Sequence, residues 1–369
     1  MSCDYTALAA TGVQGMQPYQ PGKPVEELAR ELGLDPAGIV KLASNENPLG
    51  PSDRALSALR EAMGDIARYP DGNGFHLKNK LAERLNVTPE SLTLGNGSND
   101  VLELVARAFA EPGSEIVYSE HAFAVYPLVT QAIGATHVKV PARDWGHDLE
   151  AMAQAVTERT AVVFVANPNN PTGTVVEKEE VHRFLRCIPE NVIVVLDEAY
   201  CEYLSGERYP DGVQWLAEFP NLIVSRSFSK AWGLSGLRVG YGVSSPEIAG
   251  ILNRIRQPFN VNTMALAAAA AVLDDSEYLK RSIEVNRVGL EQLSNGFRNL
   301  GLDVIPSVAN FVAVDTGRDA GPVNEALLRE GVIVRPIGAY GMPRHLRVSV
   351  GLESENRRCL QAMEKVLSQ

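Results

Sequence analysis

A lysine within residues 225–242 has surroundings that could make it chemically reactive. Lys230 follows a short β-rich run and is flanked by the apolar side chains of Phe228 and Trp232. Burial among such side chains disfavours the ammonium form and lowers the lysine pKa. A neutral amine can form a Schiff base with a carbonyl compound, so Lys230 is a candidate nucleophile. The alternative interpretation is a loop lysine that pairs with a nearby carboxylate.

Hydrogen-bond donors that suit a phosphate group lie near this lysine in the sequence. Ser227 and Ser229 come just before it, and Arg238 follows eight residues after it. Two hydroxyls and the planar fork of an arginine are well suited to bind a phosphate dianion. The segment therefore combines a candidate nucleophile with a candidate anion site.

A second candidate anion site is the segment LTLGNGSNDVLELV, which predicts a strand, a glycine-rich turn and a helix. The backbone N–H groups of Ser98 and Asn99 would open that helix, where free donors and the helix dipole favour an anion. The motif is neither GxGxxG nor a Walker A loop, so it gives little support to nucleotide binding.

Two polar motifs follow other β-rich runs. NVIVVLDEAY places Asp197 at the carboxyl end of a buried strand, with Tyr200 one turn later. Open α/β sheets bind ligands at that edge. VVFVANPNNPTG ends a further strand in a turn that presents the amide of Asn170. The simpler interpretations are a helix N-cap for Asp197 and a plain turn for the second motif.

The elements that must position these residues alternate between β-rich runs and helical stretches. Several runs are nearly continuous in Val, Ile and Leu, as in parallel strands that are buried on both faces. Strands are predicted at 92–94, 116–118, 137–140, 161–165, 192–196, 222–225 and 239–243. We therefore expect an α/β large domain over residues 41–270, with a mainly parallel seven-stranded sheet covered by helices.

The pattern changes in residues 271–369, which predict a smaller α+β domain. A long charged helix is expected at about 275–300 and a second helix near 322–330. Short strands are expected at 310–314, 332–335 and 346–350. Residues 1–40 are proline-rich and predict an arm, with a helix that packs on the small domain.

Composition narrows the class of protein further. The 369 residues include 34 Lys+Arg and 45 Asp+Glu, so the net charge is 34 − 45 = −11, which argues against nucleic acid or an anionic membrane as a partner. The longest weakly apolar run, 264–273, is far shorter than the ~20 residues that span a bilayer. The histidines are scattered along the sequence, so we expect no metal site. The cysteines are also scattered and the N-terminus does not resemble a signal peptide, so we expect a protein of the reducing cytoplasm.

The motifs together resemble the pyridoxal-phosphate-dependent aminotransferases of fold type I. SxSK with Arg238, the DEAY strand end, the NPNNPTG turn and the GNGS turn occur in the order typical of that family. The flanking segments resemble its branch of histidinol-phosphate aminotransferases. They are MQPYQPGKPVEEL, KLASNENPLGPS, RYPDGNGFHLKNKLA, RQPFNVN, PSVANFV and HLRVSVG.

The resemblance implies a role for each motif in binding pyridoxal 5'-phosphate. Lys230 would hold the cofactor as a Schiff base, and Asp197 would pair with the protonated pyridine nitrogen. Tyr200 and Asn170 would contact the ring hydroxyl. Phe123 would stack on the ring, where many relatives carry tyrosine, so the stacking surface is kept and a hydroxyl is lost. The cofactor phosphate would meet Ser98, Asn99, Ser227, Ser229 and Arg238.

The resemblance also implies how the substrate binds and that the protein is a homodimer with shared active sites. Arg347 would bind the substrate anion, assisted by Arg335, Tyr19 and Asn45. Tyr69 would reach the cofactor phosphate of the other subunit. Structural interpretations remain open for four of these residues: Tyr19 packing the arm, Arg335 in an ion pair, Tyr69 half-buried, and Asn45 holding the SNENP turn.

The implied reaction converts L-histidinol phosphate and 2-oxoglutarate to imidazole acetol phosphate and L-glutamate, with ping-pong kinetics, in histidine biosynthesis. Aromatic amino-acid aminotransferases and threonine-phosphate decarboxylase are alternatives on the same fold. A cofactor-binding regulator is a further alternative. It would need a DNA-binding extension, which the proline-rich, non-basic first forty residues do not resemble.

Overall fold

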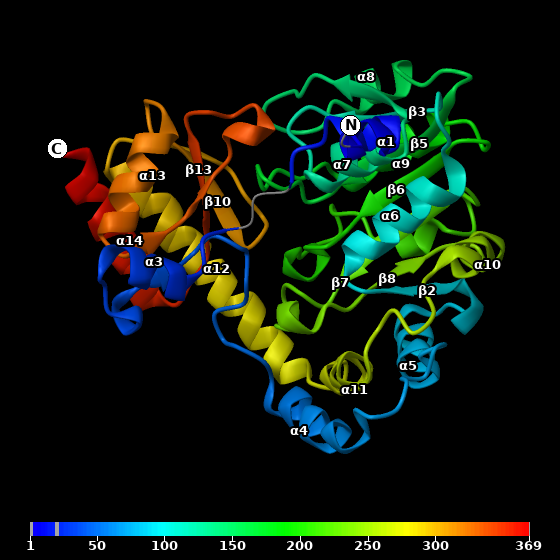
Figure 1. The fold of residues 1–369 in the computed structure, drawn as a ribbon, viewed down its shortest axis with the longest axis horizontal. Coiled ribbons are helices and arrows are strands. Elements are labelled where there is room, and N and C mark those ends of the chain that lie inside the picture. The colour runs from blue at the N-terminus through cyan, green and yellow to red at the C-terminus, as the bar shows by residue number, and fades with distance from the viewer. Residues whose placement is uncertain (1–2, 19–21, 369) are drawn as a thin grey trace.

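The computed structural model describes residues 3–18 and 22–368. A seven-stranded sheet organises the larger part of the chain (Figure 1). Its strands, in spatial order, are β2 (Leu92–Gly95), β8 (Gly240–Val243), β7 (Leu222–Ser227), β6 (Ile193–Asp197), β5 (Thr160–Ala166), β3 (Glu115–Ser119) and β4 (Thr136–Val140). Only β8 runs antiparallel to its neighbours. The predicted strands and the mainly parallel sheet are therefore confirmed.

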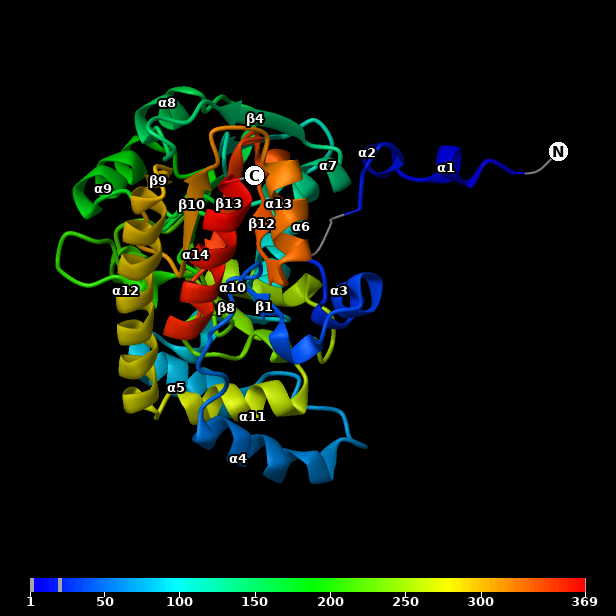
Figure 2. The same ribbon diagram turned by 90° about the vertical axis from the view of Figure 1, so that its left-hand side faces the viewer.

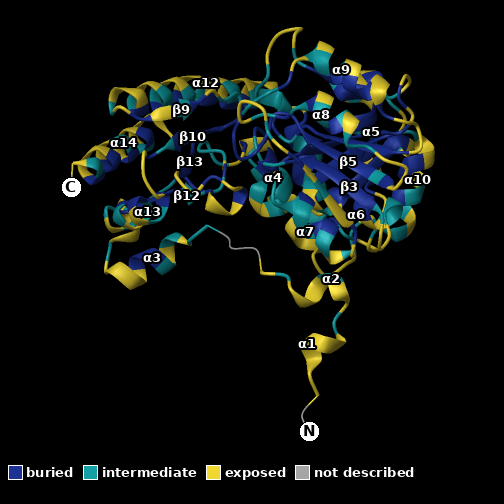
Figure 3. Cartoon of the chain, turned by 90° about the horizontal axis from the view of Figure 1, so that it is seen from above, coloured by how far each residue is buried: buried dark blue, intermediate teal, exposed yellow. Residues whose placement is uncertain are grey.

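Helices cover both faces of this sheet, which explains the continuous apolar runs. Val162 and Phe164 of β5 pack in one cluster with α6 (Ser98–Phe109), α7 (Val125–Ala132) and α10 (Pro246–Ile255). Val163 and Val165 point to the other face. The helices there are α5 (Phe75–Leu85), α8 (Leu149–Gln154), α9 (Lys178–Cys187) and α11 (Thr263–Val272), with α4 (Asp53–Ala62) against α11. Figure 3 shows the buried strands β3 and β5 between these layers.

The smaller sheet has four antiparallel strands in the order β12 (Arg335–Pro336), β13 (His345–Ser349), β10 (Phe311–Asp315) and β9 (Asp303–Ile305). It packs with α12 (Ser276–Asn299), α13 (Ala320–Arg329) and α14 (Glu353–Leu367) around a separate core. The α+β class predicted for this part is confirmed.

The prediction of one continuous strand at 332–335 is wrong, because the structure has two short strands there. Its first part, β11 (Val332–Ile333), pairs with β1 (Val40–Lys41) in a separate two-stranded sheet. Its last part, β12, pairs with β13. The chain changes partners within four residues, and an apolar run does not show which sheet each residue joins.

The N-terminal segment has two parts. Helix α3 (Val25–Leu32) packs Leu28 against Ala43 and Ile333, and its assignment to the small domain stays a prediction. Before it, the short helix α2 (Thr11–Gln14) contacts α7, and α1 (Tyr5–Leu8) extends away from the body of the molecule (Figure 2). Within the described ranges, no helix is both long enough and apolar enough to cross a membrane.

Candidate active site

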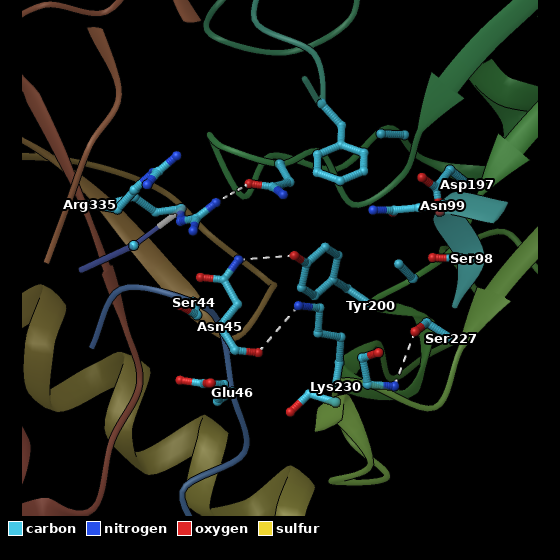
Figure 4. A pocket seen from close by; sticks show the side chains of 18 of the residues that line it. Ser44, Asn45, Glu46, Ser98, Asn99, Asp197, Tyr200, Ser227, Lys230 and Arg335 are labelled. Atoms are coloured by element: carbon cyan, nitrogen blue, oxygen red, sulfur yellow. Dashed lines mark hydrogen bonds between the residues drawn. The ribbon is translucent and has the colours of Figure 1, made fainter. Parts of the chain in front are cut away.

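A pocket of about 370 Å³ is lined by residues from both sheets (Figure 4). Strands β5, β6 and β7 run parallel, so the segments that follow them meet at one edge of the sheet. Asn170 follows β5, Asp197 ends β6, and Lys230 follows β7. The predicted residues that line the pocket are Lys230, Asp197, Tyr200, Ser98, Asn99, Phe123, Asn170, Ser227, Ser229, Arg238, Asn45, Arg335 and Arg347.

Lys230 is held on a loop whose apolar residues, Phe228 and Ala231, are fully buried. Its Nζ donates a hydrogen bond to the backbone carbonyl of Asn45 at 3.4 Å. Desolvation lowers the pKa of Lys230 to about 8, and the nearby guanidinium of Arg347 acts in the same direction. The lowered pKa expected from the sequence is therefore confirmed, and a substantial fraction of this amine is neutral at mildly alkaline pH.

Asp197 is buried, and its two carboxylate oxygens have different surroundings. Oδ2 accepts a hydrogen bond from the hydroxyl of Tyr126 at 2.9 Å. Oδ1 is buried without a hydrogen-bond partner among the residues that the structure describes. Desolvation raises the pKa of Asp197 to about 6, while the Tyr126 hydroxyl and the backbone N–H of Ala199 oppose that rise. At neutral pH the site therefore holds a carboxylate with one oxygen left for a cationic donor.

Gly97, Gly240 and Arg238 enclose the start of α6. A Cβ on Gly97 would collide with the Arg238 guanidinium, and a Cβ on Gly240 would collide with the backbone nitrogen of Ser98. Arg238 donates to the Ser229 hydroxyl at 3.3 Å, and its backbone adopts a left-handed conformation with φ of 55°. These close approaches leave a compact cradle of N–H and O–H donors that is suited to a phosphate group.

Asn45 connects the two sheets through the pocket. Its side-chain amide donates to the Tyr200 hydroxyl at 3.0 Å. Its Oδ1 accepts from Ser349 at 3.0 Å, and its carbonyl accepts from Asn310 at 3.0 Å. Asn45 therefore does more than hold a turn, because it fixes Tyr200 relative to strand β13.

Two arginines lie side by side on the small sheet. Arg335 on β12 is directly opposite Arg347 on β13, and residues in that register present their side chains on the same face. Arg347 is buried and donates to Asn170 Oδ1 at 2.6 Å and to the carbonyl of Ala43 at 2.8 Å. Its Nε is buried and has no hydrogen-bond partner in the described part of the chain. The pair forms a cationic end of the pocket.

Tyr69 and Tyr19 differ from the other predicted site residues. Tyr69 does not line the pocket; it is 82% exposed and stacks on the ring of Phe259 at 4.7 Å. A contribution from Tyr69 to this chain's own pocket is therefore not seen. Tyr19 lies outside the described residues.

Sequence reasoning missed two residues that belong to the site's surroundings. Glu46 lines the pocket, and its charge partly opposes the desolvation that lowers the pKa of Lys230. Tyr126 reaches Asp197 from α7, although a tyrosine within an apolar helix reads as a core residue. Phe123 precedes α7, which begins at Val125, so the helical period alone does not link the two side chains in the sequence.

The comparisons with known proteins agree with this architecture. The sequence profile of the family "Aminotransferase class I and II" matches residues 37–363, so the chain belongs to that family, whose members of this fold bind pyridoxal phosphate. The chain is 62% identical to "Histidinol-phosphate aminotransferase 2" of Pseudomonas fluorescens over 368 residues, covering 100% of both chains. It is 63% identical over 365 residues to the protein of that name from Pseudomonas aeruginosa, covering 99% of both. These identities place it in the histidinol-phosphate aminotransferase branch.

Solved structures show the same fold. The histidinol-phosphate aminotransferase of Sinorhizobium meliloti, in complex with pyridoxal-5'-phosphate, superposes with a TM-score of 0.90 at 32% identity, covering 97% of this chain and 96% of that one. An aspartate aminotransferase of Thermus thermophilus with maleate gives a TM-score of 0.83 at 25% identity, covering 97% and 99%. The fold class predicted from the sequence is therefore confirmed.

Proposed function

We propose that this chain transfers the amino group of L-histidinol phosphate to 2-oxoglutarate, giving imidazole acetol phosphate and L-glutamate in histidine biosynthesis. The observation that carries the proposal is one pocket that holds a desolvated lysine, a buried carboxylate and a pair of arginines. The full-length identity to the two Pseudomonas proteins supports the choice of substrate.

The residues present fit pyridoxal 5'-phosphate. Asp197 Oδ1 is buried without a partner in the described chain and would accept a hydrogen bond from the pyridine nitrogen. The cradle at Gly97 and Arg238 would hold the phosphate, and Lys230 would hold the cofactor covalently. Tyr200, Asn170, Phe123, Ser98, Asn99, Ser227 and Ser229 would complete the site. When bound, this cofactor supplies an electron sink for the electrons released at the substrate Cα.

The chain's own residues then supply proton transfer and charge. Asp197, ionised above pH about 6, would keep a bound heterocyclic nitrogen protonated. The Lys230 amine would take the proton from the substrate Cα and deliver it to the C4′ carbon of the cofactor. Its lowered pKa makes the neutral, basic form available near physiological pH.

Arg335 and Arg347 would bind the anionic end of each substrate. Their guanidinium groups can donate paired hydrogen bonds to either a phosphate or a carboxylate, so the same two arginines serve both half-reactions. Asn45, which lines the pocket beside Tyr200, would contact the substrate as well. Tyr19 remains a prediction for the same end of the site.

We also propose that the protein is a homodimer and acts in the cytoplasm. The exposed, stacked pair of Tyr69 and Phe259 offers an aromatic surface to a second copy of this chain. That placement supports a Tyr69 that completes the neighbouring active site. The four cysteines are free, which is typical of proteins from a reducing compartment.

The test is a comparison of amino donors with the purified protein. With 2-oxoglutarate as acceptor, kcat/KM for L-histidinol phosphate should exceed kcat/KM for phenylalanine and for tyrosine. A larger value for an aromatic acid would make the protein an aromatic aminotransferase. Release of carbon dioxide from threonine phosphate, without transamination, would make it a decarboxylase.

A further inference from the structure

We infer that Tyr126 is a positioning residue that holds Asp197 in one orientation and directs its second oxygen into the pocket. The inference rests on the proposed function, because it concerns the carboxylate that would meet the cofactor nitrogen. The hydroxyl of Tyr126 donates to Asp197 Oδ2 at 2.9 Å. Both side chains are buried, and Asp197 lines the pocket while Tyr126 lies behind it.

The ring of Tyr126 is fixed from several sides. It is fully buried and lies flat on Phe164, with ring centroids 4.6 Å apart and an angle of 2° between planes. Phe123, which lines the pocket, meets it edge-on at 6.0 Å. Thr130 donates to the backbone carbonyl of Tyr126 at 2.7 Å, which anchors the helix backbone that carries the ring. A hydroxyl on such a ring cannot follow a moving carboxylate, so it fixes where the carboxylate points.

The two oxygens of Asp197 are therefore not equivalent. Oδ2 is bonded to Tyr126, whereas Oδ1 is buried without a partner among the residues described. A half-turn of the carboxylate only exchanges its two identical oxygens, but any other rotation would take an oxygen away from the Tyr126 hydroxyl inside a buried site, which carries a free-energy cost. The fixed hydroxyl thus selects the orientation that leaves one oxygen for a ligand.

Tyr126 also favours the charged form of Asp197. The other ionisable groups that face Asp197 are Glu198, Lys230 and Tyr200. Among the influences that oppose desolvation, the Tyr126 hydrogen bond is the largest, and Glu198 acts in the opposite direction. Without the hydroxyl, the pKa of Asp197 would rise above its value of about 6, and the carboxylate would be protonated at higher pH.

The test is the pH dependence of cofactor affinity in Tyr126→Phe. Full-length protein is freed of cofactor and titrated with pyridoxal 5'-phosphate at several pH values between about 5 and 8. In wild type the affinity should fall as the pH drops through the Asp197 pKa. In Tyr126→Phe the same fall should occur about half to one pH unit higher, the value of one hydrogen bond. Phenylalanine keeps the stacked ring, so the fold is preserved.

Tyr118→Phe is the matched control, because Tyr118 is a buried tyrosine whose hydroxyl bonds His137 at 2.8 Å instead of Asp197. Its pH dependence should match wild type. The inference would be overturned if the affinity of Tyr126→Phe fell at the same pH as in wild type, or if the substitution lowered the affinity equally at every pH. In a protein that already carries Asp197→Asn, adding Tyr126→Phe should not change the pH dependence of cofactor affinity. If Asp197→Asn alone left both affinity and pH dependence unchanged, the proposed cofactor role of Asp197 would fail instead.

Discussion

Burial perturbs the two central ionisable residues in opposite directions. It lowers the pKa of Lys230 to about 8 and raises the pKa of Asp197 to about 6. Both shifts favour the neutral form, because removing water penalises either charge. Between these values the carboxylate is mostly ionised and the amine mostly protonated. Above pH about 8 the carboxylate persists and the amine is mainly neutral.

This difference predicts the pH dependence of cofactor attachment. The neutral amine of Lys230 is the form that attacks an aldehyde, so the rate should rise with pH and level off above about 8. From pH 7 to pH 8 the neutral fraction of a group with that pKa grows about fivefold. Stopped-flow absorbance after mixing cofactor-free protein with pyridoxal 5'-phosphate measures the rate. A rate that still rises steeply above pH 9 would contradict the lowered pKa.

Asp197→Asn should separate binding from chemistry. The amide keeps the shape and a hydrogen-bond acceptor but cannot keep a heterocyclic nitrogen protonated. Some cofactor should still bind, while abstraction of the substrate Cα proton should slow by on the order of a thousandfold or more. A deuterium-labelled substrate in single-turnover experiments reports on that step. A loss below about tenfold would count against the electron-sink role.

At the scale of elements, strand register makes the arginine pair. Arg335 and Arg347 are twelve residues apart in sequence and face each other across β12 and β13. The sequence shows both residues, but register depends on the turn and on the sheet partners. The same reason explains why the predicted strand 332–335 is divided, since β11 and β12 join different sheets.

Substitution of Arg347 tests the anion site. Arg347→Ala should raise KM for both substrates by about tenfold to a hundredfold, the value of hydrogen bonds to charged groups. Arg347→Lys keeps the charge but loses the planar fork and the bonds to Asn170 and Ala43, so it should recover only part of the loss. Steady-state kinetics with each substrate varied in turn measures this. Unchanged KM values would place the anion elsewhere.

Much of the large sheet was predictable, because β3, β5, β6 and β7 carry runs of buried apolar residues. The short edge strand β9, with Asp303 exposed and only Ile305 buried, has no such run and was missed. The role of Tyr126 was missed because it depends on which side of α7 faces the end of β6. The division of the chain at residue 270 stays a prediction.

At the scale of the whole molecule, Tyr69 predicts shared active sites. Lys230→Ala should be inactive, without the visible absorbance of bound cofactor, and Tyr69→Ala should be impaired. If Tyr69 serves the neighbouring subunit, a heterodimer of the two variants has one intact site. Mixing them under conditions that exchange subunits should therefore restore activity, up to about a quarter of the wild-type level by random pairing.

The control is Arg347→Ala mixed with Lys230→Ala. Arg347 and Lys230 line the same pocket of one chain. A heterodimer of these two variants therefore has no intact active site, because one site lacks Lys230 and the other lacks Arg347. Each site then carries one defect, and little activity should return. Recovery in this control equal to that of the Tyr69→Ala mixture would contradict the proposed exchange of Tyr69 between subunits.

The hydrogen bonds of Asn45 have a consequence for how the protein withstands heat. Asn45 joins Tyr200, beside the large sheet, to Ser349 in the small sheet and to Asn310 just before β10. A ligand in the pocket would touch both sides of that bridge and bind only the folded chain, so its binding free energy stabilises both parts at once. Occupancy then acts as a reversible crosslink: the protein's resistance to melting and to proteases depends on the supply of its cofactor as well as on its sequence.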